Sequence, residues 1–129
     1  MKPLAFCNGE MALFNLIHAW KEELGVDIHS SFKVLVPSFT FSGTVNAIVA
    51  NNLIPLFCDI DDTMTIDLNK IDNIEEDLKM VVAVGAYGSS PNVEELVEFC
   101  QRNKLVLILD NAASFGVKFK NKFSCNYKI

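Results

Sequence analysis

Apolar residues along this 129-residue chain follow two kinds of spacing, helical and continuous. Helical spacing predicts a helix from just after Asn8 to about Gly25, a second at 42–52 and a third at 89–104. Continuous apolar runs, typical of strands covered on both faces, predict strands at 33–37, 53–60, 79–88 and 105–109. A weaker pattern at 67–78 indicates one more helix.

Individual residues indicate where these helices begin, which of their faces are buried and where one strand lies in the sheet. Asn8 is suited to cap the first helix, and Ser90 followed by Pro91 is suited to begin the third. The predicted buried face of the first helix is Leu13, Leu16, Ile17, Trp20 and Leu24, and that of the second is Val45, Ile48 and Val49. Pro55 favours an edge position for the strand at 53–60, or a strand that begins after Pro55, because proline cannot donate to a neighbouring strand.

Helices that alternate with buried strands predict an α/β fold in three layers, with a mainly parallel sheet and helices on both faces. The whole of 1–129 is long enough for one domain. In such folds ligands collect at the carboxyl ends of the strands. This places 38–41, 87–90 and Asp110 at one candidate rim, with Asp110 expected on a central strand.

Charge and cysteine usage narrow the function classes. Sixteen acidic residues outnumber eleven basic ones, so a nucleic-acid partner is not expected. No membrane span or signal peptide is evident, and we expect a soluble protein of the cytoplasm. The four cysteines, Cys7, Cys58, Cys100 and Cys125, are scattered without a C-x-x-C pair, which favours reduced thiols. Three of the four lie in apolar runs and are expected in the core.

Several polar motifs allow more than one interpretation. Asn8-Gly9 could cradle an anion at a helix start or be an ordinary cap. Asp59 and Asp61 in "FCDIDDTM" resemble the nucleophile and general acid of haloacid-dehalogenase-like phosphatases, whereas the same loop lacks the glycine and glutamate of a calcium-binding EF-hand. His18 and His29 stand apart, and no metal site is predicted.

Four stretches together resemble the DegT/DnrJ/EryC1/StrS family of pyridoxal-phosphate-dependent sugar aminotransferases. They are "NGEMALFNLIHA", "VLVPSFTFSGTVNAIVANNLIPLFCDID", "VVAVGAYGSSPNVEEL" and "LVLILDNAASFG", in the family's order. The resemblance covers residues 5 to about 120. It implies the core of the large domain of an aspartate-aminotransferase-like fold, in which the chain would be a truncated, central piece.

The resemblance also implies roles for individual residues. Gly9 and Glu10 would offer backbone N–H groups to the phosphate of the cofactor, Phe41 would stack on its pyridine ring, and Asp110 would pair with the protonated ring nitrogen. Two positions depart from the family pattern. Glu10 replaces a threonine, and Ala113 replaces a glutamine or histidine that would contact the phenolic oxygen of the cofactor.

No lysine in this chain has the setting of the family's Schiff-base lysine, and Lys128 lacks both its context and its spacing from Asp110. The resemblance therefore implies an aminotransferase piece that is inactive alone, with no catalytic residue of its own. In the intact enzyme the implied partners are a keto-sugar nucleotide, an amino donor such as glutamate and a second subunit of a homodimer, in polysaccharide or nucleotide-sugar synthesis. A non-catalytic α/β dimerisation module and the phosphatase stay open as alternatives.

Overall fold

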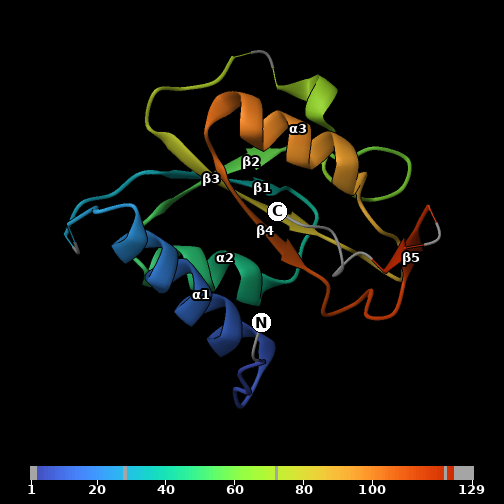
Figure 1. Cartoon of the computed structure of the whole chain (residues 1–129), viewed down its shortest axis with the longest axis horizontal. Coiled ribbons are helices and arrows are strands. Elements are labelled where there is room, and N and C mark those ends of the chain that lie inside the picture. Colours follow the sequence, from blue (N-terminus) through green and yellow to red (C-terminus); the bar gives the residue numbers. More distant parts are fainter. Residues whose placement is uncertain (1–2, 28, 72, 121, 124–129) are drawn as a thin grey trace.

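The computed structural model describes residues 3–27, 29–71, 73–120 and 122–123 (Figure 1). Its helices are α1 (Gly9–Glu23), α2 (Ser42–Ala50), α3 (Val93–Asn103) and the short 3-10 helix η1 (Leu68–Lys70). Its strands are β1 (Lys33–Pro37), β2 (Ile54–Cys58), β3 (Leu78–Val84), β4 (Val106–Asp110), β5 (Lys118–Phe119) and β6 (Lys122–Phe123).

Strands β1 to β4 form one parallel sheet in the order β2-β1-β3-β4, and β5 pairs with β6 as a separate antiparallel ribbon. Pairing brings Pro37 beside Cys58 and Val84 beside Asp110, so that the strands end at one side of the sheet. Helix α2 connects β1 to β2 and α3 connects β3 to β4, as β-α-β units require. The predicted α/β class with a parallel sheet is confirmed.

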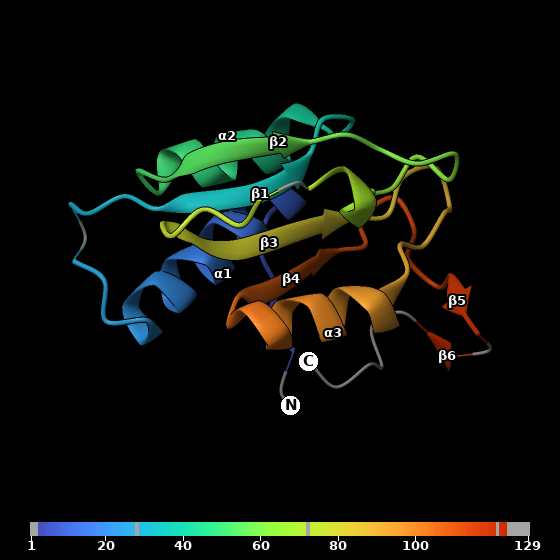
Figure 2. The same ribbon diagram turned by 90° about the horizontal axis from the view of Figure 1, so that it is seen from above.

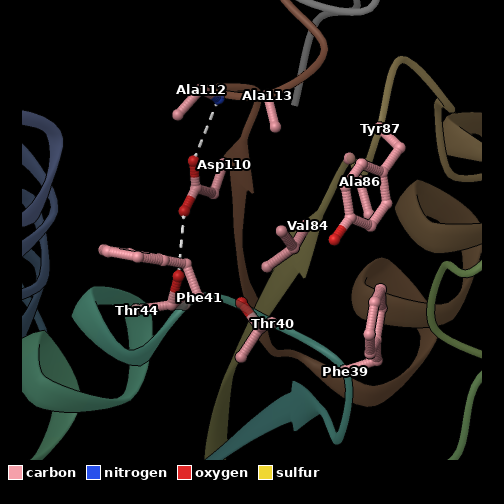
Figure 3. A pocket seen from close by; sticks show the side chains of 11 residues that line it. Phe39, Thr40, Phe41, Thr44, Val84, Ala86, Tyr87, Asp110, Ala112 and Ala113 are labelled. Carbon is pink, nitrogen blue, oxygen red and sulfur yellow. Dashed lines mark hydrogen bonds between the residues drawn. The ribbon is translucent and has the colours of Figure 1, made fainter.

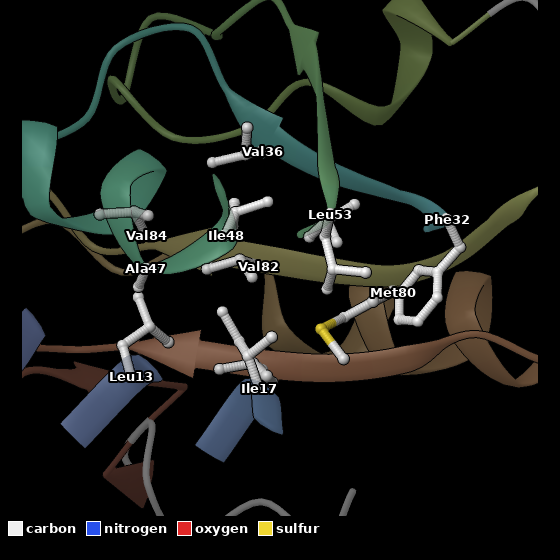
Figure 4. Packing of buried hydrophobic residues seen from close by; sticks show 12 residues of the cluster. Leu13, Ile17, Phe32, Val36, Ala47, Ile48, Leu53, Met80, Val82 and Val84 are labelled. Atoms are coloured by element: carbon white, nitrogen blue, oxygen red, sulfur yellow. The ribbon is translucent and has the colours of Figure 1, made fainter. Parts of the chain in front are cut away.

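Helices cover both faces of this sheet (Figures 1 and 2). Helices α1 and α2 pack on one face, where Leu13, Ile17 and Ile48 meet the inward residues of β1, β3 and β4 (Figure 4). Helix α3 covers the other face with Leu96, Phe99 and Cys100. Because every central strand is buried on both sides, its residues need no polar alternation, which explains the continuous apolar runs of the sequence.

A buried polar contact joins α1 to α2. The Asn51 side chain, just after α2, donates to the carbonyl oxygens of Phe14 at 3.0 Å and Ala47 at 2.8 Å. The buried Lys21 ammonium in α1 donates to the backbone carbonyl oxygen of Asn51 at 3.1 Å. His18 also reaches the Asn51 amide oxygen, at 3.3 Å. These bonds satisfy the carbonyl end of α2 against α1 and fix how the two helices meet.

Helical faces and boundaries differ from the sequence predictions. Leu16, Trp20 and Leu24 of α1 and Val49 of α2 are exposed, whereas Gly43, Thr44 and Ala47 are buried with Ile48. Of the predicted face of α2, Ile48 is buried, Val45 is half-buried and Val49 is wrong, because the buried side of the helix also includes small residues that apolar spacing does not mark. The predicted 89–104 helix begins later, because the Asn92 side chain, instead of Ser90, caps it by accepting from the Glu95 N–H.

The predicted helix at 67–78 is also wrong. Of the described residues between 67 and 78, only those of η1 are helical, and Asp67 caps η1 by accepting from the Asn69 N–H at 3.0 Å. The sequence then reaches β3, which begins at Leu78 inside the predicted helix. Pro55 is interpreted correctly, since β2 lies at an edge of the sheet. Within the described residues, none of the helices has the length and apolar character needed to span a membrane.

Two of the described cysteines are buried and one is exposed. Burial raises the pKa of the Cys100 thiol to about 12, and burial followed by the charge of Asp67 raises that of Cys58. Cys7 is exposed, and Cys125 lies outside the described residues. Since the thiolate is the reactive form, the two buried thiols are expected to be slow nucleophiles.

Alkylation with iodoacetamide at pH 8 is expected to modify Cys7 at least about tenfold faster than Cys58 or Cys100, because both buried thiols are inaccessible and hold their protons. Peptide mass mapping over time measures each rate. In 8 M urea, the three rates should converge. Equal rates in the native protein would contradict the burial of Cys58 and Cys100.

Replacing Asn51 by alanine is expected to lower the free energy of unfolding by about 1–3 kcal/mol, because two buried carbonyl oxygens lose their donor. Urea denaturation followed by circular dichroism measures the change. Asn15→Ala is the matched control, because the Asn15 side chain donates to the Met11 carbonyl oxygen at an exposed site and its loss should cost less than about 0.5 kcal/mol. Equal effects of the two substitutions would argue against the buried junction.

Candidate functional site

A pocket of about 320 Å³ opens at the carboxyl ends of the strands. Its walls come from the segment after β1, the first turn of α2, the end of β3 and the segment after β4 (Figure 3). The lining residues are Phe39, Thr40, Phe41, Thr44, Val84, Gly85, Ala86, Tyr87, Asp110, Ala112 and Ala113. The structure therefore brings all three predicted rim segments to one place, although Ser38 and residues 88–90 do not line the pocket.

The Asp110 carboxylate is held from two sides. One oxygen accepts from the Thr44 hydroxyl in α2 and the other from the backbone N–H of Ala112, each at 3.1 Å (Figure 3). The Asp110 carbonyl oxygen accepts from the Gly85 N–H at 2.9 Å, which extends the β3–β4 pairing past the end of β3. Asp110 is therefore anchored by both its backbone and its side chain, and its carboxylate has a fixed direction in the pocket.

Aromatic rings lie on two sides of this carboxylate. Phe41 follows β1 on the side of α2, and its ring is 78% exposed. Phe39 and Tyr87 lie across the pocket from it, with ring centroids 5.9 Å apart and planes tilted by 35° (Figure 3). Tyr87 is 81% exposed and has a positive φ of 47°. Exposed rings around one carboxylate give the pocket flat apolar surfaces that suit an aromatic ligand with a cationic edge.

Gly85 permits the close approach of two loops under the pocket. A β-carbon at this position would lie 2.0 Å from the Ser114 hydroxyl oxygen and 2.8 Å from the Ser89 carbonyl oxygen. Ser114 is buried, and its N–H donates to the Asn111 carbonyl oxygen at 3.1 Å. The segment after β4 therefore turns tightly onto the end of β3, which leaves Ala112 and Ala113 at the pocket wall.

Thr40 contributes a polar group without a hydrogen-bond partner to the lining of the described pocket. Its hydroxyl oxygen is buried and has no hydrogen-bond partner in the described structure. An unsatisfied buried hydroxyl costs about 1–3 kcal/mol, and such groups are rare enough to need an explanation. A buried polar atom without a partner in the lining of a pocket is typical of a site built for binding.

The site residues predicted from the sequence divide into two groups. Phe41, Asp110 and Ala113 line the pocket, whereas Gly9 and Glu10 lie outside its lining, at the start of α1. Asp110 is on β4, the last strand of the described sheet, so the prediction of a central strand is wrong for these residues. Lys128 lies outside the described residues.

Sequence reasoning missed Thr44, the hydroxyl partner of Asp110, although it lies three residues after Phe41 at the start of the predicted second helix. Its helical position conceals its role, because a threonine there is also compatible with simple packing. Phe39 was within the predicted rim but had no assigned role. Only the pairing of β1, β3 and β4 brings these two residues to the same pocket as Asp110.

Other candidate motifs lie elsewhere. Asp59 follows the edge strand β2, and Asp61 accepts from the N–H of Thr63 at 2.8 Å within its own loop. Among the described residues, no group of three or more His, Cys, Asp or Glu side chains could hold a metal ion. The Asn8 side chain caps α1 by accepting from the Met11 N–H at 2.8 Å, as predicted. His18 stacks on Phe14.

Solved structures with this fold include an aminotransferase and a dehydratase that holds pyridoxal phosphate, and their fold is that of the fold-type-I aminotransferases. One is Helicobacter pylori PseC, an aminotransferase involved in the biosynthesis of pseudoaminic acid, with TM-score 0.79 and 26% identity over 92% of this chain. Another is a GDP-4-keto-6-deoxymannose-3-dehydratase with a trapped PLP-glutamate geminal diamine, with TM-score 0.79 and 25% identity over 89% of this chain. These two structures assign the fold of this chain to the fold-type-I class of pyridoxal-phosphate-dependent enzymes.

The chain belongs to the DegT/DnrJ/EryC1/StrS aminotransferase family, whose sequence model matches residues 2–128. GDP-perosamine synthase of Escherichia coli O157:H7 is 32% identical over 102 residues, which are 78% of this chain. The predicted family is thus confirmed. The match spans only 28% of that synthase, 31% of PseC and 30% of the dehydratase.

Gly85→Ala is expected to lower the free energy of unfolding by about 1–3 kcal/mol and to displace 112–114, because the added methyl group overlaps Ser114 and a backbone oxygen. Urea denaturation and amide chemical shifts measure the two effects. Gly9→Ala is the control, since nothing lies within 4 Å of a β-carbon there. Equal changes in stability and in chemical shifts for Gly85→Ala and Gly9→Ala would contradict the close contact between Gly85 and the segment after β4.

Proposed function

We propose that this chain is the cofactor-ring part of the large domain of a pyridoxal-phosphate-dependent aminotransferase that acts on a keto-sugar nucleotide. Family membership supports the reaction class. The names of GDP-perosamine synthase and of the GDP-4-keto-6-deoxymannose dehydratase support a nucleotide-sugar substrate. The PLP-glutamate adduct in the dehydratase supports glutamate as amino donor.

The observation that carries the proposal is the fixed Asp110 carboxylate in a pocket with aromatic walls. A carboxylate beside a pyridine nitrogen stabilises its protonated form by a charge-assisted hydrogen bond. When bound, pyridoxal phosphate supplies a conjugated ring that withdraws electrons from the carbon that gains or loses the amine. The residues that line the pocket fit the ring of this cofactor, because Asp110 faces an opening bordered by Phe41 and the unpartnered Thr40 hydroxyl.

Each lining residue then has a defined role. Asp110 would hold the proton on the ring nitrogen, and Thr44 would act as a positioning residue that keeps the carboxylate turned toward the pocket. Phe41 would cover one face of the ring and exclude water from it. Ala113 leaves the side of the phenolic oxygen without a polar contact from this position. Gly9 and Glu10 would lie nearest the phosphate.

Further parts of the proposal concern the rest of the enzyme. No lysine is among the residues that line the described pocket, and we propose that transamination needs one that this stretch does not supply. We also propose a homodimer that works in the cytoplasm. The exposed apolar side chains of α1, Leu16, Trp20 and Leu24, provide surface that association would cover.

Asp110→Asn is expected to weaken the binding of pyridoxine, a ligand with the ring but without phosphate or aldehyde, by about ten- to a hundredfold, because the charge that pairs with the ring nitrogen is lost. Titration followed by NMR of the ¹⁵N-labelled ligand measures both affinity and ring protonation. Asp62→Asn removes an equal charge from an exposed loop and should leave both unchanged.

Two results would contradict the proposal. Pyridoxine that fails to bind the chain at millimolar concentration would reject the ring site and favour the non-catalytic α/β module. Binding that is equally strong in Asp110→Asn and Asp62→Asn would show that the ligand does not use this pocket.

A further inference from the structure

The Glu10 side chain leans from α1 toward α2. Its carboxylate oxygen lies 3.1 Å from the position that a β-carbon on Gly43 would occupy, and the Phe41 ring lies at the same distance from that position. Gly43 is in the first turn of α2, next to Thr44, which holds Asp110. Glu10 is therefore near the pocket without lining it.

The start of α2 lacks a carboxylate or a capping side chain of its own. Its N-cap residue, Phe41, makes no side-chain cap hydrogen bond, and the first turn contains no acidic residue. Glu10 also belongs to the first turn of α1. The Glu10 carboxylate thus belongs to the first turn of α1 and lies close to the first turn of α2. The partial positive charge at a helix start stabilises a nearby negative group.

Charge in the pocket has one sign. Asp110 is the only charged residue in the lining of the described pocket, which contains no lysine, arginine or histidine. Glu10 adds a second negative charge at the corner where, under the proposed function, the phosphate of the cofactor would arrive. A dianion at this corner meets a like charge, whereas a ligand with a cationic ring meets two carboxylates.

We infer that Glu10 is a specificity-determining residue whose carboxylate occupies the anion position between α1 and α2, so that the pocket selects an unphosphorylated, cationic pyridine ligand over its 5′-phosphate. This inference rests on the proposed function, because it places the phosphate end of the ligand beside Glu10. Gly43 contributes by leaving room for the carboxylate, since any side chain there would crowd it.

The test compares pyridoxamine with pyridoxamine 5′-phosphate, neither of which has an aldehyde that could react with surface lysines. Calorimetric titration at low salt gives both dissociation constants for the 129-residue chain and for Glu10→Thr, Glu10→Gln and Glu23→Gln. Glu23 ends α1, so its substitution removes the same charge from the same helix at a distance from the pocket. Circular dichroism checks that each variant is folded.

The unsubstituted chain is expected to bind pyridoxamine at least about fivefold more tightly than its phosphate. Glu10→Thr and Glu10→Gln should each tighten the binding of the phosphate by about tenfold and change that of pyridoxamine by less than about threefold. Glu23→Gln should behave as the unsubstituted chain. A higher salt concentration should reduce the difference in affinity between the two ligands, because the Glu10 carboxylate is exposed to solvent and salt screens its charge.

The outcomes separate this inference from the proposed function. If both ligands bind and the Glu10 variants keep the ligand preference of the unsubstituted chain, the inference is overturned while the ring site stands. If Glu23→Gln shifts the preference as much as Glu10→Gln, total charge is responsible and the inference is again overturned. If neither ligand binds the chain or any variant, both the inference and the proposed function fail.

Discussion

Parallel pairing of β3 with β1 on one side and β4 on the other is the constraint on which the site depends. The pairing of Val84 with Asp110 fixes how far β4 extends, and the pairing with β1 places 39–41 on the opposite side of the same opening. A shift of one residue in β4 would turn Asp110 toward the other face of the sheet. The pocket thus exists because three strand ends are aligned.

The hydrogen bond from Thr44 to Asp110 links the aligned strand ends to the helices. Thr44 is in α2, and α2 is held against α1 through Asn51 and the buried Lys21. Core packing on this face therefore determines where the hydroxyl donor lies. The ring end of the site is assembled from residues that the fold makes rigid, whereas the anion end depends on one long, exposed side chain, that of Glu10. Under the proposed function, packing would specify the ring end of the ligand, and the charge of Glu10 would act on the other end.

Sequence patterns predicted the fold class well because buried strands of a parallel sheet are apolar throughout, as in "MVVAV" and "LVLIL". They were less successful where tertiary contacts override spacing. Small residues such as Gly43 and Ala47 are buried against α1 while Val49 is exposed, because closely packed helices exclude larger side chains. Family resemblance located Phe41 and Asp110 at one pocket, but Thr44 could be recognised only from the spatial pairing of segments 66 residues apart.

Strand β4 has a second consequence, for the behaviour of this chain in solution. In the described sheet it is paired on one side only, and the N–H and C=O groups of its outer side form a template for another strand. Its residues Val106 to Leu109 are all apolar, and none of them is charged or a proline, the residues that discourage strand addition. In the isolated chain, this strand edge could therefore pair with the same edge of another copy. The net charge of −5 makes the copies repel one another and so limits this association.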